Sequence, residues 1–498
     1  MKLRFNVPIL ALALGLALSL CANDLQWPSD AFAIWPLREE FPLQTSVVSW
    51  SDWLVFFNAH SREPGVRAIL NEMAASGARA VWWRTFGGGH ALYSSKVDGV
   101  TTGNYAGQGA DYSTFNSLAE AVSYGHKLGL KVYAWYTPLE EAHGWAANVR
   151  SVYTDAHPEM SDYDNIGHSW QTPSMYYPQY RAYKLALGKE MLDCGVDGMI
   201  IDFERIGAPG RSNNWGYIPA LLKEFNARYG RSGKPGNDDP DFIAFRNEFV
   251  AKFMREMAAE SHRRGKEFAV MYQERSNHGV TAHCNAPGWY KEGFVDHVCV
   301  TNSWEWDAVT ADLFRSIVSS YGTKPWPIQY GFYGEKDQLL GQARMLAAEG
   351  AENIVWFETT YLHGMDKYCV LRELACHDEA TLTSPEYDFS QGGVLHVSGA
   401  VTWQLFLGDR QLGQGAPGQC VRVEIPAGSG CGRLVLKGRV ADQAGAAGVG
   451  LFGEAVGADG AKVSVVTGRD WRAEKGALQT IGVMGVPPFL APLDKEVR

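Results

Sequence analysis

The 498-residue sequence lacks cysteine spacings typical of zinc sites and has no apolar run after Leu20 that is long enough to cross a membrane. Its eight cysteines include no CxxC pair and no Cys/His cluster, so we expect neither a metal nor a cofactor. Positive charge is scarce, with 45 Lys and Arg against 55 Asp and Glu, a formal net charge of -10. This excess of negative charge argues against nucleic acid or an anionic membrane as a partner.

The N-terminus has the composition of an export signal. Met1 to Arg4 is basic, Val7 to Leu20 is apolar with small residues, and Cys21-Ala22 follows. We interpret residues 1–22 as a signal peptide, which predicts a secreted or periplasmic protein. Lipoprotein anchoring through Cys21 is the alternative, although Leu20 is a poor residue to precede a lipidated cysteine.

Export to an oxidising compartment permits disulfides. The pairs closest in sequence, Cys369/Cys376 and Cys420/Cys431, are the first candidates. Three more cysteines are interpreted as buried thiols: Cys194, Cys284 and Cys299.

Strand-like and helix-like patterns alternate along residues 23–380, after a lead-in that reaches Gln44. Clear helical patterns cover Pro64 to Gly77, Phe115 to Gly129, Tyr180 to Cys194 and Asp241 to Arg264. Eight short apolar runs are the predicted strands: Thr45–Ser49, Ala78–Arg84, Lys131–Tyr136, Met199–Phe203, Phe268–Tyr272, His297–Thr301, Ile328–Phe332 and Asn353–Phe357. Eight such units predict an α/β fold, a (β/α)8 TIM barrel. A doubly wound open sheet is the alternative, weakened by the absence of a GxGxxG turn.

The pattern changes after about residue 380. Helical periodicity stops, and short alternating runs such as Gly393 to Val397 and Cys420 to Ile425 are separated by Gly-rich turns. Residues 385–498 are therefore predicted to form a small all-β sandwich of jelly-roll type.

Two acidic residues close the fourth predicted strand. Asp202 and Glu204 are two positions apart, so in an extended chain they project to the same side. Two like charges at the end of a buried strand repel each other and lose hydration, which favours a functional over a structural role. The alternative is a salt-bridged strand end with Arg205 or another arginine as partner.

Catalytic residues of such barrels lie beyond the carboxyl ends of the strands. Glycoside cleavage requires a carboxylic acid and a second carboxylate. We assign Glu204 as general acid/base and Asp202 as nucleophile or charge stabiliser, with Glu335 or Glu358 as the alternative nucleophile. The predicted substrate-binding residues are Arg84, His90, Trp135, Tyr136, Glu274, Asn302, Trp304 and Trp356. Among them the three tryptophans are predicted sugar platforms, and Arg84, His90 and Tyr136 hydroxyl contacts.

Several motifs occur in an order that resembles the glycosyl-hydrolase-like 10 family. They span roughly residues 45–365 and comprise Gly89–Lys96, Gly129–Pro138, His157–Glu159, Gly195–Arg205 and Gly293–Val298. The resemblance implies a TIM barrel and a glycan substrate. Asp202 matches an aspartate of the family motif, whereas Glu204 stands where the family usually has isoleucine.

The same strand is similar to the signature of family 18 chitinases. Asp197, Gly198, Asp202 and Glu204 match it, and Ile200 replaces its middle aspartate. This similarity implies that Glu204 is the proton donor and that Asp202 orients a substrate acetamido group. The stretches Gly432–Arg439, Gly448–Phe452 and Val466–Trp471 resemble galactose-binding-like modules. That resemblance implies an accessory role, with a purely structural domain as the alternative.

The sequence thus predicts a secreted glycoside hydrolase that acts on O-glycosidic bonds of a poly- or oligosaccharide. A non-catalytic glycan-binding protein on the same scaffold is the alternative. The expected partner is a carbohydrate.

Overall fold

The structure is a computed structural model that describes residues 32–48, 62–102, 111–143, 146–202, 214–273, 284–301, 309–331, 334–364, 367–440, 447–468 and 470–482. The chain divides into two units. One comprises residues 39–375, and the other combines residues up to 38 with residues 376–491. The predicted signal peptide, residues 1–22, lies outside the described residues.

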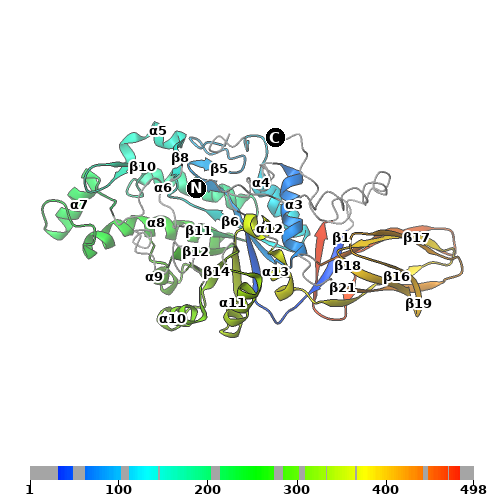
Figure 1. The fold of residues 1–498 in the computed structure, drawn as a ribbon. Helices are drawn as coiled ribbons and strands as arrows, with labels where there is room; N and C mark the ends of the chain where they lie inside the picture. The colour runs from blue at the N-terminus through cyan, green and yellow to red at the C-terminus, as the bar shows by residue number, and fades with distance from the viewer. Residues whose placement is uncertain are drawn as a thin grey trace, which may run out of the picture. The chain divides into compact units, whose positions relative to one another are not determined.

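Eight parallel strands close into a barrel in the first unit, confirming the predicted fold class (Figure 1). Their order around the barrel follows the chain: β2 (Leu43–Val48), β3 (Ala80–Arg84), β6 (Lys131–Tyr136), β11 (Gly198–Asp202), β12 (Glu267–Gln273), β13 (His297–Thr301), β14 (Trp326–Tyr330) and β15 (Asn353–Phe357). Each overlaps a predicted strand. β14 begins two residues earlier than predicted, because Trp326 and Pro327 pair with Cys299 and Val300 of β13.

The barrel interior is filled with side chains. Alternate residues of the strands point inward and form one buried cluster: Val47, Ala80, Trp82, Tyr133, Trp135, Ile200, Ala269, Met271, Cys299, Trp326, Ile328, Tyr330, Val355 and Phe357. Gly198 starts β11 at a point where the backbone of the next strand and the Tyr133 ring lie close. A Cβ there would lie 2.6 Å from the Glu267 carbonyl oxygen and 2.9 Å from the Tyr133 ring, so only glycine fits without movement of the backbone.

Helices alternate with the barrel strands, as the sequence predicts. They are α3 (Glu63–Ala75), α4 (Ser117–Lys127), α6 (Pro178–Asp193), α8 (Pro240–Arg263), α9 (Ala286–Lys291), α10 (Ala311–Tyr321), α11 (Lys336–Ala348), α12 (Thr359–Gly364) and α13 (Tyr368–Ala375). Local signals fix their starts. In α8, for example, Asp239 accepts hydrogen bonds from the amides of Asp241 and Phe242.

Three insertions enlarge the loops of the barrel. After β3 comes a hairpin of β4 (Phe86–Gly87) and β5 (His90–Ala91). The segment between β6 and α6 contains β7 (Ala142–His143), β8 (Ala146–Arg150), α5 (Val152–Ala156), the 3₁₀ turn η4 (Pro158–Met160), β9 (Ser161–Tyr163) and β10 (Ser169–Pro173). Between β11 and α8 lies α7 (Pro219–Tyr229), whose Leu221 and Phe225 pack with Phe242 and Phe245 of α8.

The second unit is a sandwich of two mainly antiparallel sheets, again as predicted. One sheet has the order β20-β17-β22-β1-β25, with β23 paired to β22, and the other has the order β19-β18-β21-β16-β24. The strands are β16 (Glu379–Asp388), β17 (Gly393–Gly399), β18 (Val401–Leu407), β19 (Arg410–Gly415), β20 (Cys420–Ile425), β21 (Cys431–Val440), β22 (Val449–Val456), β23 (Lys462–Val466), β24 (Arg472–Ala473) and β25 (Ala477–Gly482).

Strand β1 (Phe32–Leu37) belongs to this sandwich, although the sequence analysis assigned its residues to the lead-in of the barrel domain. It pairs antiparallel with β25 along its whole length and with β22 at Ile34. In Figure 1 the blue β1 lies among the orange and red strands. Burial explains the placement, because Ile34, Trp35 and Leu37 are part of the sandwich core.

The two disulfides tried first in the sequence analysis are not formed, since no disulfide joins cysteines in the described part of the chain. Cys420 and Cys431 lie on strands of different sheets. Cys376, just after the end of α13, forms an isolated backbone β-bridge with Leu37. Of the predicted buried thiols, Cys284 and Cys299 are buried and Cys194 is half-buried. Among the described residues no helix has the length and apolarity needed to cross a membrane.

Candidate active site at the carboxyl end of the barrel

Asp202 is the last residue of β11 and lies on the inward face of that strand. Ile200, two residues earlier, belongs to the interior cluster, and strand alternation places Asp202 on the same side. Its side chain is 1% exposed. Burial, reinforced by the negative charge of Asp202, raises the pKa of the Cys299 thiol on β13. A buried carboxylate therefore lies among interior side chains at the end of the barrel where catalytic groups are expected.

Trp135 of β6 holds this carboxylate. The strands β6 and β11 are neighbours, with Trp135 opposite Ile200, and the indole Nε1 donates a 3.0 Å hydrogen bond to Asp202 Oδ2. The ring also meets Phe357 edge to face, with ring centroids 5.6 Å apart. Trp135 is 1% exposed. Its surroundings in the described structure therefore support a role in positioning Asp202, in place of the predicted role as a sugar platform.

Arg84 stacks on the same indole. Its guanidinium carbon lies 4.4 Å from the centroid of the Trp135 ring, a cation–π geometry. The Nε of Arg84 donates to the Phe86 carbonyl at 2.9 Å, and its Nη2 pairs with the Glu140 carboxylate. Both members of the ion pair are buried. The predicted hydroxyl contact is thus corrected, because the guanidinium is 3% exposed and engaged by protein groups.

Glu140 was missed in the sequence analysis. It follows β6 by four residues and is 1% exposed, and its Oε1 accepts no hydrogen bond from the residues that the structure describes. The next residue, Glu141, pairs with Lys184 of α6, and both are fully buried. Burial lowers the pKa of Lys184 to about 8, against the opposing effect of Glu141. The signal in the sequence was this carboxylate doublet just after a buried strand.

Glu358 and Glu335, the alternative nucleophiles, have different surroundings. Glu358 directly follows β15 and is 4% exposed, so a second buried carboxyl group lies at the carboxyl end of a barrel strand. Glu335 is exposed and forms the N-cap of α11, where its amide donates to Gln338 Oε1 at 3.0 Å. Helix capping accounts for Glu335 without a catalytic role.

Tyr136 and Trp356 are on the outward faces of their strands. Their neighbours Trp135, Val355 and Phe357 belong to the interior cluster, and neither Tyr136 nor Trp356 does. The Tyr136 hydroxyl donates to the Lys184 carbonyl of α6, and Trp356 Nε1 donates to Gln44 Oε1. Both side chains are fully buried on the outer side of the barrel strands. The alternation therefore corrects these two assignments.

His90 is positioned by the β4–β5 hairpin. Its Nδ1 lies 2.8 Å from the Gly88 carbonyl oxygen, and the side chain is 7% exposed. Burial lowers the pKa of the imidazole, against the hydrogen bond with Gly88 and the charge of Glu141. A neutral ring is the consequence at neutral pH. The remaining predicted residues lie outside the described residues: Glu204, Glu274, Asn302 and Trp304.

The arrangement is a buried carboxylate at the open end of a parallel barrel, held by an indole that is itself held by a buried cation. No group of three or more Asp, Glu, His or Cys suited to a metal ion occurs among the described residues.

Comparisons with known proteins find solved structures that are similar to this chain. The glycoside hydrolase domain of PgaB (BpsB) from Bordetella bronchiseptica is 12% identical with a TM-score of 0.46, covering 67% of this chain and 98% of that domain. A GH18 chitinase from Pseudoalteromonas aurantia is 12% identical with a TM-score of 0.35, covering 66% and 99%. The glycoside hydrolase domain of PelA from Pseudomonas aeruginosa is 14% identical with a TM-score of 0.32, covering 63% and 94%.

No family model matches the chain, and no curated protein matches it. The specific resemblance to the glycosyl-hydrolase-like 10 family therefore stays a prediction.

Proposed function

We propose that this protein is a glycoside hydrolase with its active centre at the carboxyl end of the barrel. The observation that carries the proposal is the Asp202 carboxylate, buried inside the end of β11 and oriented by Trp135 Nε1. The hydrogen bond from the buried indole orients the carboxylate before substrate binds. Preorganised charge of this kind is worth most where positive charge develops in a transition state.

Glycoside cleavage develops positive charge on the sugar ring and needs a proton at the departing oxygen. In the proposed mechanism Asp202 faces the developing charge, as nucleophile or as stabiliser, and Glu204 gives the proton. Glu204 follows Asp202 by two residues and lies outside the described residues. Glu358, buried after β15, is the alternative nucleophile. Arg84 does not touch substrate in this mechanism; it holds Trp135.

The test is a panel of poly- and oligosaccharides incubated with the protein, with mass analysis of the products. Once a substrate is found, we expect Asp202→Asn and Glu204→Gln each to lower kcat by about 10²–10⁴-fold. Glu335→Gln is the matched control, since it neutralises a carboxylate that caps a helix, and it should keep wild-type turnover. Wild-type turnover in both D202N and E204Q removes the assignment.

The second candidate function is non-catalytic glycan binding. It is favoured by the departures from the two family motifs, because Glu204 stands where the first family has isoleucine and Ile200 replaces the middle aspartate of the second. Binding of a glycan on the same panel, with no product released from any bound glycan, would establish it.

We further propose that the protein is exported, to the periplasm or the medium, on the basis of residues 1–22. N-terminal sequencing of the protein isolated from its own cells tests this. A chain that begins at Met1 in the cytoplasmic fraction contradicts it.

A further inference from the structure

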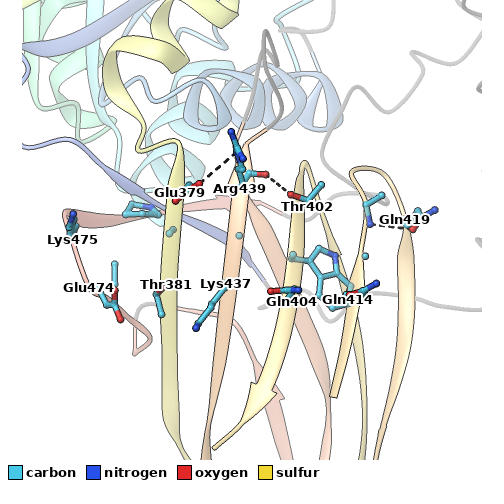
Figure 2. Close-up of a pocket in the computed structure, with 17 residues that line it drawn as sticks. Glu379, Thr381, Thr402, Gln404, Gln414, Gln419, Lys437, Arg439, Glu474 and Lys475 are labelled. Atoms are coloured by element: carbon cyan, nitrogen blue, oxygen red, sulfur yellow. Dashed lines mark hydrogen bonds and ion pairs between the residues drawn. The ribbon is translucent and has the colours of Figure 1, made fainter. Parts of the chain in front are cut away.

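A groove runs across the outer face of the sheet β19-β18-β21-β16-β24 in the sandwich (Figure 2). Its volume is about 760 Å³, within the range of about 300–1,000 Å³ that is usual for small-molecule sites. All its lining residues belong to the sandwich unit. The groove is therefore separate from the barrel site.

Four polar side chains form a row across four adjacent strands of this groove. Strand pairing aligns Thr381 with Lys437, Lys437 with Gln404, and Gln404 with Gln414. Adjacent strands are about 4.8 Å apart, so the row spans roughly 14 Å. Figure 2 shows these four residues side by side along the sheet.

The middle of this row keeps its hydrogen-bonding capacity. Within the described part of the chain no hydrogen bond joins the side chains of Thr381, Gln404 or Lys437 to another residue. The Lys437 ammonium lies 5.2 Å from the centroid of the Phe406 ring. By contrast, the next row along the strands is internally satisfied, since Arg439 pairs with Glu379 at 3.7 Å and Thr402 donates to the Arg439 carbonyl.

Trp403 lies beneath this row, on the opposite face of the sheet. Its neighbour Gln404 belongs to the exposed row, whereas Trp403 is 2% exposed and is part of the sandwich core. Its cross-strand neighbour Gly415 leaves room for the ring, because a Cβ there would lie 2.6 Å from the indole. The indole therefore supports the floor of the groove from inside the sandwich.

Charge and polarity narrow the class of ligand. The lining carries three basic side chains, Lys437, Arg439 and Lys475, against two acidic ones, Glu379 and Glu474, so the groove presents no strong field. No large exposed apolar side chain of the described residues lies in it, whereas protein interfaces have aromatic and apolar centres. Amide, hydroxyl and ammonium groups in a row suit a ligand with many hydroxyl groups and no net charge.

We infer that this groove is a second, non-catalytic site that binds a neutral oligosaccharide laid across strands β16, β21, β18 and β19. Thr381, Lys437 and Gln404 hydrogen-bond its hydroxyl groups. The inference concerns a site outside the barrel and holds whether or not the barrel hydrolyses the same sugar.

The experiment uses the full chain, both wild type and Asp202→Asn, with neutral hexasaccharides of glucose, mannose, galactose, xylose and N-acetylglucosamine. Hexagalacturonate is the acidic comparison. Hydrogen exchange locates the bound sugar, and calorimetry gives the affinity. We expect at least one neutral hexasaccharide to slow exchange in peptides from β16, β18 and β21, equally in both proteins.

The double variant Lys437→Ala/Gln404→Ala removes the middle of the row, and we expect it to weaken binding at this site at least 10-fold. Lys462→Ala is the matched control, since Lys462 is an exposed lysine on β23 of the other sheet, where it pairs with Glu454. We expect this variant to bind the sugar with the affinity of the wild type. The inference is overturned if no neutral sugar protects these strands, if only the acidic sugar does, or if the double variant binds like the wild type. The exchange measurement on the unmodified chain decides the matter even if the double variant folds poorly.

Discussion

Trp135 and Asp202 are joined by a 3.0 Å hydrogen bond from the indole Nε1 to the carboxylate Oδ2, between neighbouring strands of the barrel. The indole thus contacts two groups of the site. The guanidinium of Arg84 stacks on its ring, and its N–H bonds to the carboxylate that we propose takes part in hydrolysis. In the proposed mechanism the position of that carboxylate thus depends on residues that do not touch substrate.

Replacing Trp135 with Phe tests this link. The change keeps a six-membered aromatic ring and removes the donor to Asp202 together with the five-membered ring of the indole. Hydrogen bonds to charged groups contribute about 1.5–3 kcal/mol and lost buried volume adds to this, so we expect the free energy of unfolding to fall by at least that amount. Misplacement of a catalytic group by about 1 Å can cost roughly 100-fold, so we also expect kcat to fall by about 10- to 100-fold.

Trp356→Phe is the control for this variant. It removes the same N–H, which there donates to Gln44 on the outer side of the barrel. We expect a loss of stability and an unchanged kcat, as measured by urea unfolding and substrate turnover. Equal losses of kcat in both variants would show that the bond to Asp202 has no special role.

The buried pair of Arg84 and Glu140 is predicted to be needed for stability. Removing one partner of a buried ion pair typically costs about 3–5 kcal/mol, because the other charge stays buried without compensation. We expect Glu140→Leu to lose stability in this range and Arg84→Met/Glu140→Leu to lose less than the single variant. A double-mutant cycle by urea unfolding measures the coupling, and simple additivity would contradict it.

The amino end of the barrel is predicted to set an acid limit on stability. The hydrogen bond with His297 is the main cause that lowers the pKa of Glu267 to about 2, with help from Lys131 and Tyr133 and against the effect of burial. Because this pKa lies below that of the unfolded chain, the contribution of Glu267 is present above about pH 4.5 and is lost as the pH falls towards 2.

Glu267→Gln lacks this titration. The difference in free energy of unfolding between wild type and variant should be largest near pH 6 and should shrink as the pH falls to 3. Chemical unfolding at several pH values measures it. A constant difference over this range is the result that would refute the assignment.

Two glycines are predicted to respond in opposite directions to alanine. At Gly198 the added methyl group would meet a carbonyl oxygen at 2.6 Å, and overpacking of this kind costs about 1–3 kcal/mol. At Gly341, inside α11, the methyl group would meet nothing within 4 Å, so Gly341→Ala should gain up to about 1 kcal/mol of stability. Thermal unfolding of the two variants gives the comparison, and a shift of the same sign in both would contradict it.

The sequence predicts the barrel well because its strands are buried on both sides and are apolar over their length. The side of a strand to which a single residue points was harder to predict. Trp135 and Tyr136 were both assigned to the site, but adjacent residues of a strand point to opposite sides, and only Trp135 belongs to the interior cluster. Arg84 was also identified, yet its partner Glu140 comes from a different loop, and such long-range ion pairs leave no local pattern.

The sandwich illustrates a different limit. Residues 32–37 are apolar, but nothing near them in the chain is their partner, since Phe32 pairs with Gly482 and Leu37 with Ala477. Proximity in sequence therefore gave the lead-in assignment, and strand pairing replaced it.

This pairing gives synthesis of the protein an unusual order of events. The segment bearing Ile34 and Trp35 is translated before the barrel, whereas the strands that flank it, β22 and β25, are translated after the barrel. The segment therefore cannot pair with these two strands until the barrel has been translated. A gene fragment that starts at residue 376 would encode a sheet with a vacant inner position between β22 and β25, so expression of the sandwich by itself calls for a permuted gene in which residues 32–38 follow residue 482.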